Sequence, residues 1–287
     1  MPSLVRAAPS MRPSLLPIID GYELTQRLAA GRWCEMFLAR ASGQSNARPD
    51  YVVKRVRESQ TDEHLARALL RREAQVAAAV CQANLVSLLD ARLDEDRPFV
   101  VLPFLPGRTL EQRREQPGQI AVPQALWYTR QIAVALAALH AAGWLHCDVR
   151  PQNVIVSEQG HATLIDLGLS RRLDTAECAA DRWLAGTPDF LAPEAFQPQR
   201  QLTGAADVYA LGLVLLRLLH GSKPVIASEP VDDRRTLSEL RSQRPDVSRD
   251  VAHLLARMLA REPLRRPTAA ELVVTISRLE IESLMQW

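Results

Sequence analysis

The sequence predicts an α+β fold of two lobes, a β-rich N-terminal lobe with one main helix and a mainly helical C-terminal lobe. Over residues 22–104 the chain alternates short runs of β-branched, aromatic and aliphatic residues with turn residues, a pattern typical of strands. From residue 124 onward, apolar residues recur at three- and four-residue spacing, which indicates helices. Residues 145–193 are irregular, and a long irregular stretch inside a compact domain usually carries function.

The N-terminal lobe is expected to be a sheet interrupted by one helix. Gly31 and the polar loop 41–46 separate the first runs and favour hairpin connections. Thr61, Asp62 and Glu63 offer a cap and a negative first turn for a helix that runs to about residue 80. The strands expected around this helix cover residues 22–28, 33–40, 51–56, 85–89 and 99–104.

The C-terminal lobe is expected to be a group of helices joined by the irregular stretch. Within that stretch, residues 154–156 and 163–165 are apolar and β-branched enough for two brief strands. The helices expected from the apolar spacing cover residues 124–142, 204–219, 247–260 and 268–285.

Composition narrows the class of protein. The 287 residues are 47% hydrophobic and 24% charged with a net charge of +2, which suits a large core and disfavours a basic nucleic-acid face. No apolar run approaches the roughly 20 residues that cross a bilayer, and residues 1–20, broken by Pro17, are expected to be a flexible extension rather than a signal peptide. The cysteines show no CxxC pair and no zinc spacing, so reduced thiols and a cytoplasmic location are expected. They are Cys34, Cys81, Cys147 and Cys178.

Lys54 is the first residue whose type and position indicate a functional site. Two of the 35 basic residues are lysines, Lys54 and Lys223, and the other 33 are arginines. A lysine inside an apolar strand therefore suggests a site that requires a compact ammonium, although a solvent-facing strand lysine is an equal reading of Lys54 alone. Glu73 shares its predicted helix face with Leu69 and Ala77, and a carboxylate on a buried face needs a cation. Lys54 is the natural candidate.

A second group of residues lies in the irregular stretch. Asp148 and Asn153 stand in the segment His-Cys-Asp-Val-Arg-Pro-Gln-Asn, and Asp166 opens Asp-Leu-Gly thirteen residues later. Three oxygen-bearing side chains in this order suit Mg²⁺ shared with phosphate oxygens, with one carboxylate left to accept a proton. Each of them alone could merely cap a turn, but that reading fails for the ordered set.

These motifs identify a family resemblance that covers residues 22–285. The chain resembles the eukaryotic-type (Hanks-type) Ser/Thr protein kinases found in bacteria, and the order of its motifs is family-like. The resemblance implies a bilobal kinase domain over residues 21–287, with an N-lobe over about 21–103 and a C-lobe over about 107–287. It also implies that Gly186-Thr187-Pro188 to Ala192-Pro193-Glu194 ends the activation segment, that Asp207 braces the catalytic loop and that Arg266 pairs with Glu194.

The resemblance also assigns roles at the site. ATP with Mg²⁺, or Mn²⁺ in its place, is the implied cofactor, and adenine is expected to bind the backbone near residues 103–105. Asp148 looks like the base that accepts the substrate proton, and Asn153 and Asp166 look like the metal ligands. The catalytic residues implied are Asp148, Lys54, Glu73, Arg150 and Thr187. The nucleotide-binding residues implied are Leu28, Gly31, Met36, Val52, Lys54, Pro103, Leu105 and Ile155.

The sequence departs from the family pattern at four places. Only the central glycine, Gly31, remains in the glycine-rich loop, and Val52 replaces a smaller alanine above the adenine. Arg150 stands where Ser/Thr kinases usually carry lysine. Cys147 occupies the position of the arginine that pairs with an activation-segment phosphate, and residues 169–185 carry only Ser170 and Thr175 as hydroxyls. Activity is therefore expected not to require phosphorylation of this segment.

Three classes of function follow. The first is an active kinase that phosphorylates Ser or Thr in protein substrates, with a regulatory partner protein supplying control. The second is a pseudokinase that acts as a nucleotide-binding scaffold or switch, which the reduced glycine loop and Val52 favour. The third is a small-molecule phosphotransferase, against which the segment from Gly186 to Glu194 argues, because in the family it docks protein substrates.

Overall fold

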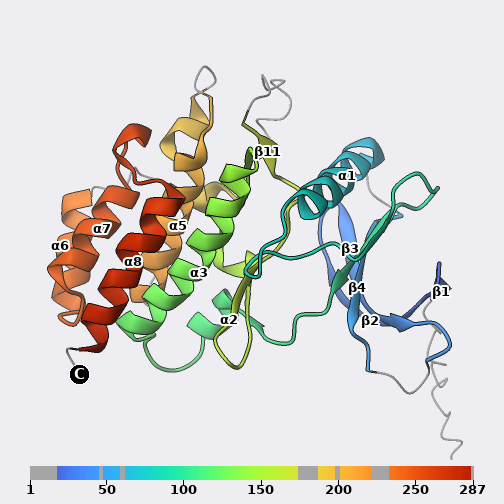
Figure 1. Cartoon of the computed structure of the whole chain (residues 1–287), viewed down its shortest axis with the longest axis horizontal. Helices are drawn as coiled ribbons and strands as arrows, with labels where there is room; N and C mark the ends of the chain where they lie inside the picture. Colours follow the sequence, from blue (N-terminus) through green and yellow to red (C-terminus); the bar gives the residue numbers. More distant parts are fainter. Residues whose placement is uncertain are drawn as a thin grey trace, which may run out of the picture.

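Two lobes lie next to each other along the long axis of the molecule (Figure 1). One is a sheet with a single helix, and the other is a group of helices. The computed structural model describes residues 18–44, 48–58, 62–173, 187–197, 201–220 and 233–285, and for residues 233–237 the backbone alone. The expected α+β bilobal fold is confirmed. The predicted extension falls largely outside this range, because its first 17 residues are not described, whereas Ile18–Ile19 form strand β1 against β2.

The N-lobe is a six-stranded antiparallel sheet in the order β1-β2-β3-β4-β6-β5. Six buried residues from β2, β3, β4 and β6, among them Phe37 and Val53, form a small core of their own. Helix α1 contacts β4 and β6. The strands are β2 (Tyr22–Ala30), β3 (Cys34–Ala41), β4 (Tyr51–Val56), β5 (Asp90–Arg92) and β6 (Phe99–Pro103).

Helix α1 (Glu63–Ala79) begins where the sequence predicts, because the Asp62 carboxylate accepts a hydrogen bond from Leu65 N–H at 3.0 Å. Its inward face includes Leu69, Glu73 and Ala77, all of them buried. The helical period therefore places one carboxylate on an otherwise apolar face, pointed at the sheet.

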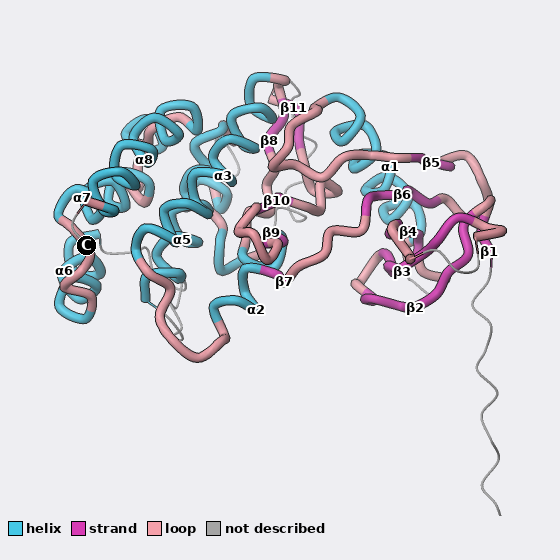
Figure 2. Tube along the Cα trace, turned by 60° about the horizontal axis from the view of Figure 1, so that its bottom comes forward, coloured by secondary structure: helices cyan, strands magenta, loops and turns pink. Residues whose placement is uncertain are grey.

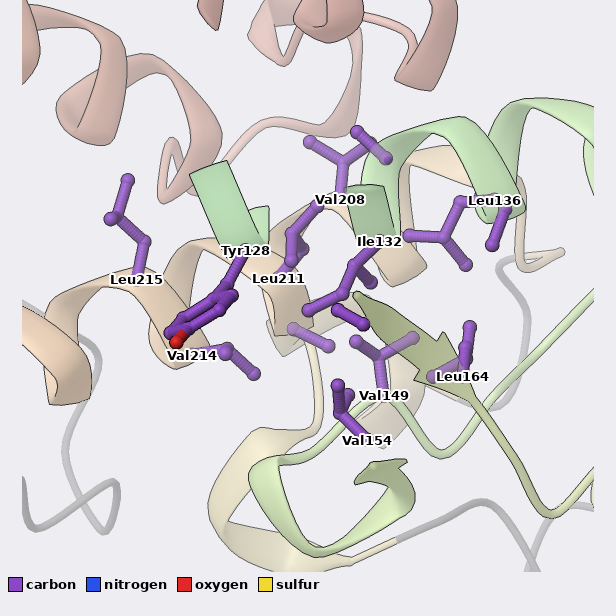
Figure 3. Close-up of a cluster of buried hydrophobic side chains, with 14 of the residues drawn as sticks. Tyr128, Ile132, Leu136, Val149, Val154, Leu164, Val208, Leu211, Val214 and Leu215 are labelled. Carbon is purple, nitrogen blue, oxygen red and sulfur yellow. The ribbon is translucent and has the colours of Figure 1, made fainter. Parts of the chain in front are cut away.

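The C-lobe is organised around α3 (Val122–Ala141), which packs against α8 (Ala269–Leu284) and α5 (Gly204–His220). Figure 3 shows Tyr128 and Ile132 of α3 meeting Leu211 of α5, with Val149 and Leu164 from the irregular stretch beneath them. The core therefore supports the irregular stretch that contains Asp148 and Asn153. The other helices of this lobe are α2 (Leu110–Arg114), α6 (Asp233–Gln243) and α7 (Arg249–Met258), with single 3-10 turns at η1 (Pro151–Asn153), η2 (Pro188–Phe190), η3 (Pro193–Phe196) and η4 (Pro263–Arg265).

Short strands lie where the two lobes meet. β7 (Arg108–Thr109), β9 (Val154–Val156) and β10 (Ala162–Leu164) form one small sheet, and β8 (Trp144–Leu145) pairs with β11 (Arg171–Arg172). Figure 2 shows β7, β9 and β10 between the C-lobe helices and the N-lobe sheet. The two strands expected near residues 154–156 and 163–165 are thus confirmed as the β9–β10 hairpin, with the second shifted by one residue.

The strand expected over residues 85–89 is wrong. Leu85 and Val86 are buried, and the segment docks on the C-lobe through an isolated bridge between Leu85 and Leu164. The N-lobe strand forms directly afterwards, as β5. An apolar run does not say which neighbour it packs on, and here it packs on the other lobe.

No helix in the described ranges is long and apolar enough to cross a membrane. Disulfides are likewise absent at Cys34, Cys81 and Cys147, whereas Cys178 lies outside the described residues.

Candidate active site

Lys54 connects the two lobes at the site. It lies in β4, opposite Met36 of β3 and Val100 of β6. Its Nζ is 2.6 Å from Glu73 Oε2 and 2.8 Å from Asp166 Oδ1. The ion pair with Glu73 that the sequence predicts is present, and Asp166 extends it across to the C-lobe.

Electrostatics keep Lys54 charged. Burial alone lowers the pKa of a lysine, but the carboxylates of Asp166 and Glu73 outweigh burial and raise the pKa of Lys54 above its ordinary value. In turn, the Lys54 ammonium holds the pKa of Asp166 below the usual range of an aspartate. The site therefore offers a fixed ammonium beside an ionised carboxylate whose side chain is 46% exposed.

Asp148 lies at the end of an irregular loop with its carboxylate fully engaged. Its Oδ1 accepts hydrogen bonds from the Thr187 N–H at 3.1 Å and from the Thr187 hydroxyl at 3.0 Å. Its Oδ2 accepts a hydrogen bond from Asn153 Nδ2 at 2.6 Å. Arg150 donates a further hydrogen bond to the Thr187 hydroxyl. The structure thus brings together four of the predicted catalytic and metal-binding residues. Thr187 and Asn153 contact the Asp148 carboxylate, and Arg150 contacts Thr187.

Asp207 holds the backbone of this loop from α5. Its Oδ2 accepts from His146 N–H and its Oδ1 from Cys147 N–H, both at 2.9 Å. Cys147 has a φ of 65°, in the left-handed region that non-glycine residues rarely adopt, so the two hydrogen bonds support a strained backbone. The brace expected from the sequence is present, and it leads directly to Asp148.

Two histidines complete this framework, and the sequence reasoning did not find them. His140 Nε2 lies 2.8 Å from Asp207 Oδ2. His146 Nδ1 accepts a hydrogen bond from Asp148 N–H at 3.2 Å, so its Nε2 carries the proton and donates to Ile165 O. His146 opens the motif that contains Asp148, which was a signal, whereas His140 ends an apolar helix and shows none.

The oxygens left over fit a hard cation. Asn153 Nδ2 faces two acceptors of Asp148, its carbonyl and its carboxylate, which fixes the amide orientation and leaves Asn153 Oδ1 without a hydrogen-bond partner among the described residues. Asp166 uses Oδ1 for Lys54. One amide oxygen and one carboxylate are too few to enclose a metal, but Mg²⁺ commonly takes one or two protein ligands and completes its shell with phosphate and water.

A cavity of about 190 Å³ opens beside Lys54. Of the residues predicted to bind nucleotide, it brings together Gly31, Met36 and Lys54. Arg32 and Trp33 line it as well, and the sequence reasoning missed both because they replace glycine-loop positions without a recognisable signal.

The other predicted nucleotide-binding residues lie outside this cavity. Leu28 of β2 is 42% exposed, and Val52 of β4 lies opposite Leu102. Pro103 ends β6, and Ile155 in β9 lies opposite Thr109. Leu105 is half-buried in the segment that joins the lobes, and its N–H has no hydrogen-bond partner within the described part of the chain.

A buried ion pair fixes the end of the activation segment. Arg266 Nη1 and Nη2 lie 2.6 Å and 2.9 Å from the two carboxylate oxygens of Glu194, and both side chains are almost fully buried. Arg266 also donates to the carbonyls of Ala260 and Ala205. The predicted partnership is present, and its fork geometry suits arginine rather than lysine.

Comparison with known proteins agrees with this geometry. The family model for the protein kinase domain matches residues 22–275. The serine/threonine-protein kinase AfsK of Streptomyces coelicolor is 30% identical over 258 residues, which cover 88% of this chain and 31% of that protein. The probable serine/threonine-protein kinase PkwA of Thermomonospora curvata is 29% identical over 259 residues, or 90% of this chain and 34% of that protein. The human serine/threonine-protein kinase ULK3 is 29% identical over 267 residues, or 87% of this chain and 53% of that protein.

The chain belongs to the protein kinase domain family. It spans about a third of the length of the two bacterial relatives.

Proposed function

We propose that this chain is an ATP- and Mg²⁺-dependent protein kinase that transfers the γ-phosphate to Ser or Thr hydroxyls of protein substrates. One observation carries the proposal: Asp148 accepts a hydrogen bond from a threonine hydroxyl at 3.0 Å, the same group that a substrate would present. Within one site, the Lys54 ammonium and the Asp166 carboxylate are held 2.8 Å apart. The names of the relatives, all of them serine/threonine-protein kinases, support the same class of substrate.

Each residue has a distinct task in this proposal. Lys54, oriented by Glu73, binds the phosphates, and Asp148 orients the substrate hydroxyl and accepts its proton. Thr187 keeps the Asp148 carboxylate in place through its hydrogen bonds, and Arg150 holds the Thr187 hydroxyl in turn. Asn153 and Asp166 would hold Mg²⁺, which when bound neutralises charge on the phosphate oxygens. Catalysis then rests on positioning and charge stabilisation.

Activity without activation-segment phosphorylation is part of the proposal. Cys147 cannot bind a phosphate as arginine does. Of the two hydroxyls at residues 169–185, that of Ser170 is fully buried, and Thr175 lies outside the described residues. Phosphatase-treated and untreated enzyme should therefore phosphorylate a protein substrate at the same rate, measured as initial velocity. A large loss after treatment would contradict this.

The decisive experiment is transfer of labelled γ-phosphate from ATP, with Mg²⁺ and then Mn²⁺, to the chain itself and to generic basic proteins. Asp148→Asn should lower the rate by about 10² to 10⁴, the usual contribution of a positioned base. Lys54→Met should also lose transfer. Asp94→Asn is the matched control, because that carboxylate is 97% exposed and pairs only with Arg71 among the described residues.

Two outcomes would change the assignment. Binding of ATP without transfer under either metal would indicate the pseudokinase reading, a nucleotide-binding scaffold or switch. Transfer to small molecules but to no protein would indicate a small-molecule phosphotransferase.

The remaining expectations belong to the same proposal. We infer that the kinase domain covers residues 21–287, with its lobes meeting between about residues 103 and 107. Protein substrates follow from the family, and a regulatory partner protein stays a prediction, as does the cytoplasmic location.

A further inference from the structure

The loop between β2 and β3 is closed on itself by hydrogen bonds. Gly31 N–H donates to Cys34 O at 2.8 Å, so the one glycine of this loop has its amide occupied. Arg57 holds the other side, since its N–H donates to Trp33 O and its Nη1 to Gly31 O, each at 3.1 Å. A loop built this way has fewer free amides for a phosphate than an open glycine-rich loop would have.

Arg32 occupies the tip of this loop and lines the same cavity as Lys54 and Asp166. Its side chain is exposed, and within the described ranges it forms no ion pair with a carboxylate. The neighbouring arginines differ, because Arg27 and Arg55 both pair with Glu35. Arg32 is therefore a cation at the cavity whose charge no carboxylate of the described chain balances.

Trp33 gives Arg32 a fixed platform. The Arg32 guanidinium lies 4.4 Å from the centroid of the Trp33 ring, which is a cation–π contact. Trp33 itself is partly buried and packs against the main hydrophobic core. Stacking leaves the edge of the guanidinium, where its N–H donors lie, available for a ligand.

We propose that Arg32 is a phosphate-binding residue of the nucleotide site, held in place by Trp33, and that its guanidinium replaces the Gly31 amide, the donor that the closed loop uses within itself. A guanidinium donates two parallel hydrogen bonds to phosphate oxygens, and the cavity already holds Lys54 for the same anion. The inference rests on the proposed binding of ATP. It concerns the triphosphate and not the adenine.

The test compares ligands that share adenosine and differ in phosphates. Dissociation constants for Mg·ATP, Mg·ADP and adenosine are measured by calorimetry on the full chain and on Arg32→Ala. Losing a charged hydrogen bond should weaken ATP binding by about tenfold and leave adenosine within about twofold. Arg32→Lys should retain part of the ATP affinity, because it keeps the charge and loses the fork.

Arg27→Ala is the matched control, since it removes a positive charge from the adjoining strand where Glu35 already pairs with it. It should leave all three constants unchanged. Trp33→Phe should retain most of the ATP affinity, whereas Trp33→Ala should weaken ATP more than adenosine, because the platform is lost.

The outcomes separate this inference from the proposed function. If Arg32→Ala weakens adenosine as much as ATP, Arg32 shapes the loop and does not bind phosphate. Unchanged ATP affinity in Arg32→Ala also overturns the inference, while wild-type binding and transfer leave the proposed function standing. A wild-type chain that binds none of the three ligands overturns both.

Discussion

Asp207 shows how one buried side chain can organise a whole loop. Its two oxygens accept hydrogen bonds from two successive backbone amides and contact His140, and the loop that they hold ends in Asp148. Burial alone would raise the pKa of Asp207, but the hydrogen bond and charge of His140, together with the loop contacts, hold that pKa below its ordinary value.

Replacing Asp207 by Asn should make the protein less stable and less sensitive to acid. The lowered pKa means that Asp207 stabilises the fold fully above the ordinary carboxyl pKa of about 4, and that this stability is lost as pH falls through the lower folded value. At pH 7 the variant should lose about 1–3 kcal/mol, measured by urea unfolding. As the pH falls below about 4, the ordinary carboxyl pKa, the wild type should lose more stability than the variant. Parallel curves over that range would contradict the argument.

Sequence could predict the residues whose chemistry requires a fixed type at a fixed place. Lys54 stood out as one of two lysines, and Asp148, Asn153 and Asp166 as an ordered set. Arg32 could not be recognised, because its importance depends on its place beside Lys54 in the folded loop and on its stacking against Trp33. Roles that depend on such contacts are not visible in one sequence.

At the scale of elements, the short connection from β6 to β7 requires a glycine at position 107. Gly107 lies so close to β9 that an added Cβ would stand 2.8 Å from the carbonyl carbon of Val156 and closer still to its oxygen. The obstacle is backbone, which cannot rotate away as a side chain can. Only glycine lets β7 pair with β9 at this register, Arg108 opposite Val156.

Gly107→Ala should therefore destabilise the protein by about 1–3 kcal/mol, as overpacking usually does. The measurement is the urea midpoint at constant slope. Gly168→Ala is the control, because its Cβ would meet nothing closer than 3.5 Å. Equal midpoints for the two variants would show that the connection can shift to make room.

Elements with a strong pattern were predictable, and those that depend on tertiary contact were not. The strands β2, β3 and β4 and the helix α1 follow from alternation, turn residues and the Asp62 cap. Helices α2 and α6 were missed, because one is five residues long and the other is strongly polar. The expected strand at residues 85–89 failed because Leu85 pairs with Leu164 of the other lobe.

At the scale of the whole molecule, the segment around residues 84–86 connects the two lobes. Asn84 is buried, and its Nδ2 donates to Gln131 Oε1 at 3.1 Å and to Ala162 O at 2.8 Å. Across the same junction, Val86 N–H donates to Leu164 O at 3.0 Å and Leu164 N–H donates to Asn84 O at 2.8 Å. Helix α1 carries Glu73, and the segment that follows this helix is thus fixed to the hairpin that leads to Asp166.

Asn84→Ala should loosen this junction. Gln131 Oε1 keeps its hydrogen bond from Ala162 N–H, but the buried Ala162 carbonyl loses the Asn84 donor. A buried acceptor left unsatisfied costs about 1–3 kcal/mol in the free energy of unfolding. The measurement is urea unfolding followed by fluorescence, and Gln159→Ala, at an exposed amide of the C-lobe, is the control. If Asn84→Ala is as stable as the wild type, the backbone hydrogen bonds alone are sufficient to hold the junction between the lobes.

The burial of Lys54 in the central strand has a further consequence for proteolysis. A lysine-specific protease can cut this chain after only two residues, and one of them is Lys54, 9% exposed in β4 between β3 and β6. A peptide bond in a paired strand cannot enter a protease until the sheet opens. The appearance of a fragment of residues 1–54 would therefore time the opening of the N-lobe, without a label or an engineered site.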